Sequence, residues 1–453
     1  MEIKNVPITQ AGVTMKSRID FNSGCIGLLR SFFNGAVALF IVLLLTWSTS
    51  VYADTLVYAY VANFSDNTVS VIDTSTNTII RTIPVDGGPN GVALTPDNRF
   101  LYVVCYANGT VSVIDTSSGT VVGSPIRVGF EPYFIAITPN GAYAYVTNFG
   151  DGTVSVIDTN TNTVVGSPIS IYDNNNYEPI GIAITPNGEF VYVTTNSSDD
   201  IYVISTSSNT VVDTFSIGEL YSSYIAITPN GATGYVSNYY SNVYPIDLSN
   251  NSVGSPIFVG GVSDAYPIGI AITPNGQFAY VANDYADNAS VINTGSNTVV
   301  GSPISLGIQP YLVAITPNGE FAYISNYISN YVSVINTTSN TVVDTIQVGT
   351  KPAGIAIGAV PPPPADSFAG KVLKSRFLTQ TNRIHQLSWT ASSSPAVVGY
   401  NLYRNGILIF TTGVSGPYTY NDNNRSSKVS DIYQLTTFNA SHVESSYLSV
   451  VLQ

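Results

Sequence analysis

Charge, histidine and cysteine are all scarce in this chain of 453 residues. Only 9 % of the side chains are charged, against about 25 % in an ordinary soluble domain. The histidines are His385 and His442, and the cysteines are Cys25 and Cys105. Few basic side chains argue against a nucleic-acid partner, because affinity for phosphates rests on clustered Lys and Arg. Few imidazoles and thiols argue against a zinc, copper or haem site and against a histidine-containing triad.

The residues that are abundant describe a folded, acidic protein. Hydrophobic residues make up 44 % of the chain, with 31 Tyr and 18 Phe, which is enough apolar surface to exclude a disordered chain. The net charge is −13, and residues 54–360 contain 22 acidic but four basic side chains. Residues 361–453 are mildly basic, with seven basic and four acidic side chains. We therefore expect the middle of the chain to meet neutral or cationic ligands.

The first 53 residues have the order of segments found in a secretory signal peptide. Basic side chains come first, an apolar run follows over residues 36–45, and Val51-Tyr52-Ala53 has small residues at the cleavage positions. We predict a signal peptide over 1–53, with Met15 as an alternative start. A retained membrane anchor is the other interpretation, although the apolar run is shorter than the roughly 20 residues of a span. The expected location is extracytoplasmic (secreted, cell surface or periplasmic), with no transmembrane span in the mature chain.

A repeat of 43 to 47 residues dominates residues 54–360. A typical copy contains a small apolar first strand, a Thr-Pro-Asn/Asp turn, a second strand ending Tyr-Val-x-Asn, a third strand of the type Val-Ser-Val-Ile-Asp, and a fourth of the type Thr-Val-Val-Gly-Ser-Pro-Ile. The second strands Tyr102–Cys105 and Tyr192–Thr195 depart from this pattern at their last position. This pattern predicts a four-stranded antiparallel meander in every copy. The turn prolines are Pro96, Pro139, Pro186, Pro229, Pro274 and Pro317.

The first and last copies predict a closed ring. The repeat region begins with second, third and fourth strands at residues 57–84 and ends with an unpaired first strand at 352–357. Only ring closure lets these segments complete one another, which also removes exposed sheet edges. The sequence therefore predicts an all-β fold: a seven-bladed β-propeller of four-stranded blades over 54–360, closed by a C-terminal inner strand.

The Tyr-Val-Thr-Asn, Val-Ser-Val-Ile-Asp and Gly-Ile-Ala-Ile-Thr-Pro-Asn-Gly units resemble those of the YVTN family of β-propeller repeat proteins. The resemblance covers residues 54–360. It implies an extracytoplasmic protein, since the family includes archaeal surface-layer components and periplasmic bacterial relatives. It implies little about chemistry, because function is grafted onto a propeller scaffold.

A second domain follows a proline-rich linker at 361–365. Residues 366–453 contain alternating β segments, an early tryptophan at Trp389 and a hairpin signal at Asn405-Gly406. They resemble a fibronectin type III sandwich, and another small all-β sandwich is the alternative.

The sequence contains few signs of catalytic chemistry. There is no Gly-x-Ser-x-Gly elbow, no His-Glu-x-x-His motif and no phosphate-binding glycine loop. Residues 158–163 alternate oxygen-bearing side chains, but they lack the glycine and glutamate of a calcium loop, so a hairpin turn is favoured. The insertion at 172–178 is interpreted as a polar loop, with cation binding as the alternative. We expect no catalytic residue, no metal and no cofactor.

Aromatic side chains cluster at one end of the predicted propeller, where connections before first strands and after second strands emerge. Tyrosines beside carboxylates there are suited to holding a sugar or a peptide. Packing between blades is the alternative for both sets. The predicted ligand-binding residues are Glu131, Tyr133, Tyr177, Glu178, Tyr224, Tyr266 and Tyr311. The aromatic residues that follow second strands are Phe64, Tyr106, Phe149, Tyr239, Tyr285 and Tyr327.

These features lead to the hypothesis of a secreted, non-catalytic binding, adhesion or surface-structural protein whose partner is an extracellular or cell-envelope protein or glycan. The first alternative is a carboxylate- or metal-dependent propeller enzyme of lactonase or lyase type. The second is binding of single-stranded nucleic acid, which the four basic residues of the propeller disfavour.

Overall fold

The computed structural model describes residues 56–171, 178–359, 367–377, 380–392, 397–416, 418–423, 430–439, 444–445 and 447–452. The described residues form β-strands and no helix. Among them there is accordingly no helix long and apolar enough to cross a membrane. The predicted signal peptide at 1–53 and the linker at 361–365 lie outside the described residues.

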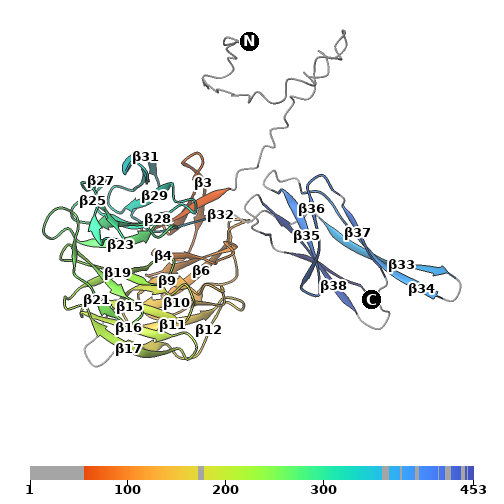
Figure 1. Cartoon of the computed structure of the whole chain (residues 1–453), viewed down its shortest axis with the longest axis horizontal. Helices are drawn as coiled ribbons and strands as arrows, with labels where there is room; N and C mark the ends of the chain where they lie inside the picture. The colour runs from red at the N-terminus through yellow and green to blue at the C-terminus, as the bar shows by residue number, and fades with distance from the viewer. Residues whose placement is uncertain are drawn as a thin grey trace, which may run out of the picture. The chain divides into compact units, whose positions relative to one another are not determined.

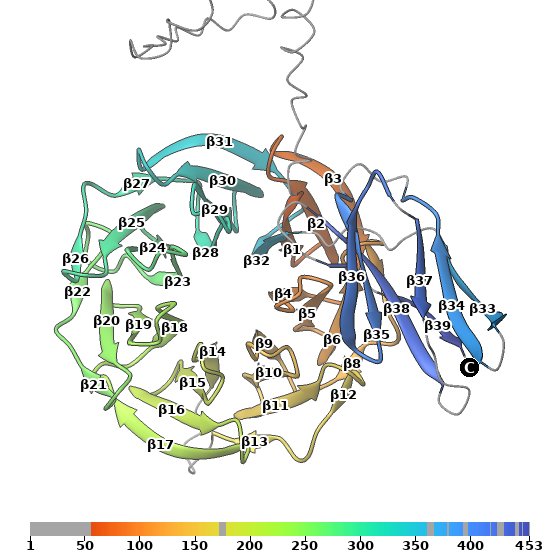
Figure 2. The ribbon, with the colours of Figure 1, turned by 45° about the vertical axis from the view of Figure 1, so that its right-hand side comes forward.

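Seven antiparallel sheets form the predicted propeller (Figure 1). Blade 1 contains β32, β1, β2 and β3 from inside to outside, and blades 2 to 7 begin with β4, β9, β14, β18, β23 and β28. The inner strands surround a common axis, and β17 and β31 lie at the rim (Figure 2). Strand β32 pairs with β1 antiparallel, for example Ile357 with Ala59. The ring is therefore closed by a C-terminal inner strand, as predicted.

The strands of the propeller fall into four positions. The inner strands are β4 (Pro89–Leu94), β9 (Pro132–Ile137), β14 (Pro179–Ile184), β18 (Ser222–Ile227), β23 (Pro267–Ile272), β28 (Pro310–Ile315) and β32 (Pro352–Ala359). The second strands are β1 (Val57–Asn63), β5 (Phe100–Cys105), β10 (Tyr143–Asn148), β15 (Phe190–Thr195), β19 (Thr233–Asn238), β24 (Phe278–Asn283) and β29 (Phe321–Asn326). The third strands are β2 (Thr68–Asp73), β6 (Thr110–Asp115), β11 (Thr153–Asp158), β16 (Asp200–Ser205), β20 (Asn242–Asp247), β25 (Asn288–Asn293) and β30 (Tyr331–Asn336).

The outer position is where the structure departs from the predicted single strand. Four blades have a Gly-Ser-Pro segment there, which splits the strand because proline donates no ladder hydrogen bond. The three blades without this segment keep one continuous strand: β3 (Thr78–Pro84), β17 (Thr210–Ser216) and β31 (Thr341–Gln347). The split strands are β7 (Thr120–Val121) with β8 (Ile126–Arg127), β12 (Thr163–Val164) with β13 (Ile169–Ser170), β21 (Ser252–Val253) with β22 (Ile257–Phe258), and β26 (Thr298–Val299) with β27 (Ile304–Ser305).

Each inner strand begins with a β-bulge, in which two residues lie opposite one residue of the second strand. Such a bulge redirects side chains, and here it lies next to the axis. In blade 3 the bulged residues are Tyr133 and Phe134, opposite Thr147. The second bulged position is glycine in four blades and bulky in three, namely Phe134, Tyr224 and Leu312.

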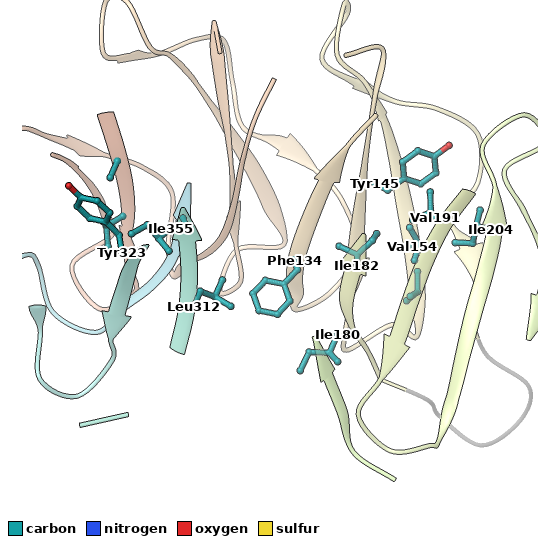
Figure 3. Packing of buried hydrophobic residues seen from close by; sticks show 14 of the residues in the cluster. Phe134, Tyr145, Val154, Ile180, Ile182, Val191, Ile204, Leu312, Tyr323 and Ile355 are labelled. Atoms are coloured by element: carbon teal, nitrogen blue, oxygen red, sulfur yellow. The ribbon is translucent and has the colours of Figure 1, made fainter. Parts of the chain in front are cut away.

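Neighbouring inner strands approach so closely at this position that no two neighbouring blades both have a side chain there. A Cβ atom on Gly269 would lie 2.6 Å from the carbonyl oxygen of Tyr311. The bulky side chains fill the axis instead: Phe134 and Leu312 belong to one buried cluster and point toward one another from opposite blades (Figure 3). The middle of the channel is therefore packed core, and space for a ligand is left at its end.

In blade 3 the last two residues of the Tyr-Val-Thr-Asn segment bond the next blade and the loop before the inner strand. The Thr147 hydroxyl donates to the carbonyl oxygen of Ile180 in the next blade, at 2.9 Å. The Asn148 side chain donates to Ser155 on the third strand and accepts from the amide of Gly129 in the preceding loop. These buried polar groups thus satisfy one another, which explains their recurrence near the axis.

The tyrosine of the same segment joins neighbouring blades at the other end of the propeller. The Tyr235 hydroxyl donates to Asn297 Oδ1 of the next blade, at 2.6 Å. Six blades have this tyrosine to asparagine bond. In the seventh pairing Gly119 stands in place of the asparagine, and the buried Tyr60 hydroxyl has no hydrogen-bond partner among the described residues.

This difference between blades gives a matched stability test. Tyr235→Phe is expected to lower the free energy of unfolding by about 1 kcal/mol, because it removes one side-chain hydrogen bond. Tyr60→Phe removes an unpartnered buried hydroxyl and is expected to leave stability unchanged or raise it. Urea unfolding of both variants measures the difference, and equal destabilisation by the two would contradict the role of the asparagine.

Residues 367–452 contain a small β-sandwich. One sheet contains β33 (Phe368–Phe377), β34 (Gln380–Trp389) and β37 (Thr419–Asn423), and the other contains β35 (Gly399–Arg404), β36 (Ile407–Gly413), β38 (Asp431–Phe438) and β39 (Leu448–Leu452). Trp389, Tyr400 and Tyr433 pack together in its core. The predicted hairpin turn is present, because Asn405 and Gly406 both have positive φ angles.

Candidate functional site at the end of the propeller axis

One end of the propeller, here called the loop face, contains the connections from the outer to the inner strand and from the second to the third strand. In every blade the first residue after the second strand donates its amide hydrogen bond to the residue just before the inner strand. In blade 6 this bond joins Asp284 to the carbonyl oxygen of Tyr266, at 2.9 Å. The bond fixes seven equivalent side-chain positions around the axis.

These equivalent positions form a ring that is aromatic in five blades. Blade 4 has Asn196 at this position and blade 6 has Asp284. The sequence pattern suggested Tyr285 for blade 6, but Tyr285 follows one residue later and is 68 % exposed. That assignment is wrong because the second strand ends at Asn283. The aromatic members of the ring are Phe64, Tyr106, Phe149, Tyr239 and Tyr327.

A pocket of about 370 Å³ lies within this ring. Aromatic rings make up most of its wall, two carboxamides and Ile268 add to it, and Asp284 is its one charged residue. Because the axis below is packed, the pocket is a closed-ended cup and not an open channel. The lining residues are Phe64, Asn90, Tyr106, Tyr133, Ile268, Asp284, Gln309, Tyr311 and Tyr327.

The carboxyl group of Asp284 is partly buried and lies near a second carboxylate. Its burial raises its pKa to about 7, and the negative charge of the nearby Asp287 adds to the increase. Within the described part of the chain, burial and the Asp287 charge act on this carboxyl group, and no hydrogen bond to it offsets them. A carboxyl group that titrates near neutral pH in a pocket of this kind is suited to general acid–base chemistry.

Two of the predicted binding residues meet across the pocket. The Tyr133 and Tyr311 hydroxyls, from blades 3 and 7, are hydrogen-bonded at 2.7 Å. Burial raises the pKa of Tyr133 to about 12 and also raises that of Tyr311, so both hydroxyls stay protonated at neutral pH. One hydrogen is used in the bond between them, and the other can be donated to a ligand oxygen.

Four other predicted binding residues, Glu131, Glu178, Tyr224 and Tyr266, do not line the pocket. Glu131 and Glu178 act on Tyr106, whose pKa is raised first by burial and then by the two carboxylates. Tyr224 lies against Phe134 in the packed axis, with ring centroids 5.2 Å apart. Tyr266 stacks between Tyr239 and Tyr285. Tyr177 lies outside the described residues, as does most of the insertion at 172–178.

No group of three or more His, Cys, Asp or Glu side chains in the described ranges is arranged to hold a metal ion. The segment at 158–163, weighed above against a calcium loop, is a turn in which the Asp158 carboxylate accepts the amide hydrogen of Asn160, at 2.8 Å. Asn162 has a positive φ of 55° there. The hairpin interpretation is confirmed at this segment.

Part of the propeller sequence matches a known protein family. Residues 92–242 match the family described as lactonase, 7-bladed β-propeller. No curated protein matches the sequence. Among solved structures, the chain is similar to Kuenenia stuttgartiensis hydrazine synthase, with 25 % identity and a TM-score of 0.56 over 61 % of this chain and 92 % of that one.

Two similar structures are described as putative 6-phosphogluconolactonases. The one from Bacteroides uniformis has 18 % identity and a TM-score of 0.58, covering 67 % of this chain and all of that one. The one from Bacteroides fragilis has 15 % identity and the same TM-score, covering 68 % and 99 %. At this identity the likeness shows the propeller fold.

The lactonase family match overturns the expectation of a non-catalytic binding or surface-structural protein, and with it the expectation that the chain is not an enzyme. The expectation rested on the leader-like first 53 residues, on the aromatic loops at one end of the propeller and on the absence of recognised catalytic motifs, histidine-based ones above all. A carboxylate in a tyrosine-lined pocket needs no histidine, so the sequence criterion was too narrow.

Asp284 is the site residue that sequence reasoning missed. The signal was present in the repeat itself. In blades 1, 3, 5 and 7 the asparagine that ends the second strand is followed by an aromatic residue, whereas in blade 6 Asn283 is followed by Asp284. Tyr285, the residue after Asp284, matches the aromatic pattern but is one residue too late in the chain. Aligning the blades on the asparagine identifies the carboxylate.

Proposed function

We propose that the propeller is a hydrolase of lactonase type, with Asp284 as general base in the axial pocket. The observation that carries this proposal is the single carboxyl group of the aromatic pocket, whose pKa is raised to about 7. The family match supports the reaction class, and the matched residues 92–242 contribute Tyr106 and Tyr133 to the pocket wall.

The proposed reaction opens a lactone ring with water. Ionised Asp284 takes a proton from a water molecule while the water oxygen attacks the lactone carbonyl carbon. One hydroxyl of the Tyr133 and Tyr311 pair, the one whose hydrogen is not used in the bond between them, donates a hydrogen bond to the oxyanion that forms. The carbon to ring-oxygen bond then breaks, the ring oxygen receives the proton from Asp284, and a hydroxy acid leaves.

The pH dependence of the rate tests this proposal. Because Asp284 must be ionised to act as base, kcat/KM is expected to rise about tenfold per pH unit below about pH 7 and to level off above it. A pH-stat assay of lactone opening between pH 5 and 9, corrected for the uncatalysed rate, measures this profile.

Asp287→Asn provides the control for the assignment. Asp287 is exposed, does not line the pocket, and contributes to the raised pKa of Asp284. Removing its charge is expected to shift the profile to lower pH and to leave the plateau rate unchanged. A wild-type kcat/KM that is constant between pH 5 and 8 would count against Asp284 as the base.

We further propose that the propeller belongs with the YVTN repeat proteins and that the sandwich is of fibronectin type III. The recurring Tyr-Val-Thr-Asn contacts support the first assignment. The division of seven strands into sheets β33-β34-β37 and β36-β35-β38-β39 supports the second. We also propose that the protein is exported, on the basis of the leader-like first 53 residues.

A further inference from the structure

We infer that the lactone bound in this pocket is an uncharged, hydroxylated sugar lactone and that phosphorylated lactones are disfavoured. This inference rests on the proposed hydrolase function and adds the substrate class. It follows from the distribution of charge on the loop face, from the positions of the basic side chains, and from the polar groups of the pocket wall.

Negative charge surrounds the pocket. Asp284 lies inside it, Asp287 is close enough to raise the pKa of Asp284, and the charges of Glu131 and Glu178 act on the wall residue Tyr106. Because like charges repel most strongly at a partly desolvated site, these groups oppose a dianionic phosphate. The acidic residues in the described loops of this face are Asp66, Asp86, Glu131, Asp151, Glu178, Asp199, Glu219, Asp264, Asp284 and Asp287.

The basic side chains that a phosphate needs are placed elsewhere. Arg81 is on the outer strand β3 and donates to the carbonyl oxygen of Ser118. Arg99 is in the turn between β4 and β5, at the opposite end of the propeller, and Arg127 is exposed on the outer strand β8. Phosphate recognition ordinarily uses bidentate arginine or several converging donors, and none of these three lines the pocket.

Lys351 is the one basic residue in the described loops of this face. Its ammonium nitrogen lies 5.6 Å from the centroid of the Tyr327 ring, so its charge is already directed at an aromatic face. A single ammonium group among ten carboxylates does not make the loop face attractive to phosphate.

The uncharged polar groups of the wall suit sugar hydroxyls. Asn90 and Gln309 present carboxamides, and Tyr106, Tyr133 and Tyr311 present hydroxyls, beside aromatic faces on which a sugar ring can lie. A pocket of about 370 Å³ accommodates a monosaccharide lactone with its hydration water. Size, polarity and charge therefore agree on a neutral sugar lactone.

The experiment compares a matched pair of substrates, glucono-1,5-lactone and its 6-phosphate, with the full-length protein. We expect kcat/KM for the unphosphorylated lactone to be about tenfold higher or more, since the phosphate is repelled by nearby carboxylates. Equal rates, or a preference for the phosphate, would overturn this inference and leave the hydrolase function standing.

Charge reversal supplies an independent readout. Asp287→Lys is expected to reduce the preference for the unphosphorylated lactone several-fold, because it replaces a nearby negative charge by a positive one. Glu320→Lys makes the same change in the exposed turn before β29, at the opposite end of the propeller, and is expected to leave the preference unchanged. An unchanged preference in a folded Asp287→Lys protein would contradict the electrostatic basis.

Failure of the hydrolase function gives a different result, in which neither lactone is opened faster than in buffer. The charge preference is then decided by calorimetric titration with gluconolactam, a ring analogue that is not hydrolysed, and with its 6-phosphate. Tighter binding of the uncharged lactam supports the substrate class. Tighter binding of the phosphate, or no binding of either, overturns it.

Discussion

Replacement of Asp284 by asparagine is expected to lower kcat/KM for lactone opening by about 10² to 10⁴, the usual contribution of a positioned general base. The substitution keeps the size and shape of the side chain but removes its ability to accept a proton. The pocket wall and the Tyr133 to Tyr311 hydrogen bond are left in place. Steady-state kinetics at pH 8, where wild-type Asp284 is ionised, measure the effect.

The same variant is expected to be more stable than the wild type at pH 8. The pKa of Asp284 is about 7 in the folded protein, against 3.8 for an ordinary solvent-exposed aspartate, so the folded state binds more protons than the unfolded chain between these values. Stability is therefore lost as the pH rises through this window, and Asp284→Asn avoids that loss. We expect a melting temperature a few degrees higher at pH 8 and little difference at pH 4.

Asp287→Asn separates these effects from a general loss of loop structure. The backbone amide of Gln309 donates a hydrogen bond to the Asp287 carboxylate, at 3.0 Å, and the asparagine side-chain oxygen can still accept it. The plateau activity of the Asp287→Asn variant is expected to equal that of the wild type. An Asp284→Asn protein that stays active and melts at the wild-type temperature would exclude Asp284 both as the base and as a destabilising buried charge.

Removal of the closing strand is the second change expected to have a large effect. A chain that ends at Thr350 lacks β32, whereas a chain that ends at Ala359 retains it. Without β32, the edge of β1 loses its backbone partners from Val57 to Asn63, and the buried Ile355 is lost from the core. The inner strands of blades 2 and 7 also lose the neighbour against which they pack.

The loss is expected to exceed the roughly 5–15 kcal/mol by which a domain is stable, because a ring with one open side exposes core and sheet edge together. We expect the shorter chain to aggregate or to unfold without a cooperative transition, and the chain ending at Ala359 to melt cooperatively. Circular dichroism during heating and size-exclusion chromatography compare the two. A cooperative, monomeric propeller in the chain that ends at Thr350 would show that closure by β32 is dispensable.

The fold could be predicted from the sequence because the repeat encodes it seven times. Each copy gives the same alternation of strands and turns, so an ambiguity in one blade is resolved by the others. Ring closure could also be predicted, since residues 352–357 form a first strand with no second strand after it. The split of four outer strands is also encoded locally, in the Gly-Ser-Pro segments, although the repeat pattern alone predicts one continuous strand.

The contacts between blades could not be predicted, because they join residues far apart in the chain. The Tyr323 hydroxyl bonds Asn77, 246 residues away, and the Tyr133 hydroxyl bonds Tyr311, 178 residues away. Sequence periodicity shows that these residues recur, but it does not show which copies face each other across the axis. The sequence alone therefore does not decide which aromatic residues bind a ligand and which pack in the core.

The sequence by itself determined the all-β propeller, its closure and its acidic character, because those properties are repeated or additive along the chain. Only the tertiary structure decided where the chemistry lies. The pKa of Asp284 depends on burial and on neighbouring charge, and both arise when seven loops converge on the axis. Because charged residues are scarce, the pocket is lined mainly by tyrosines and carboxamides, and Asp284 is its one charged residue.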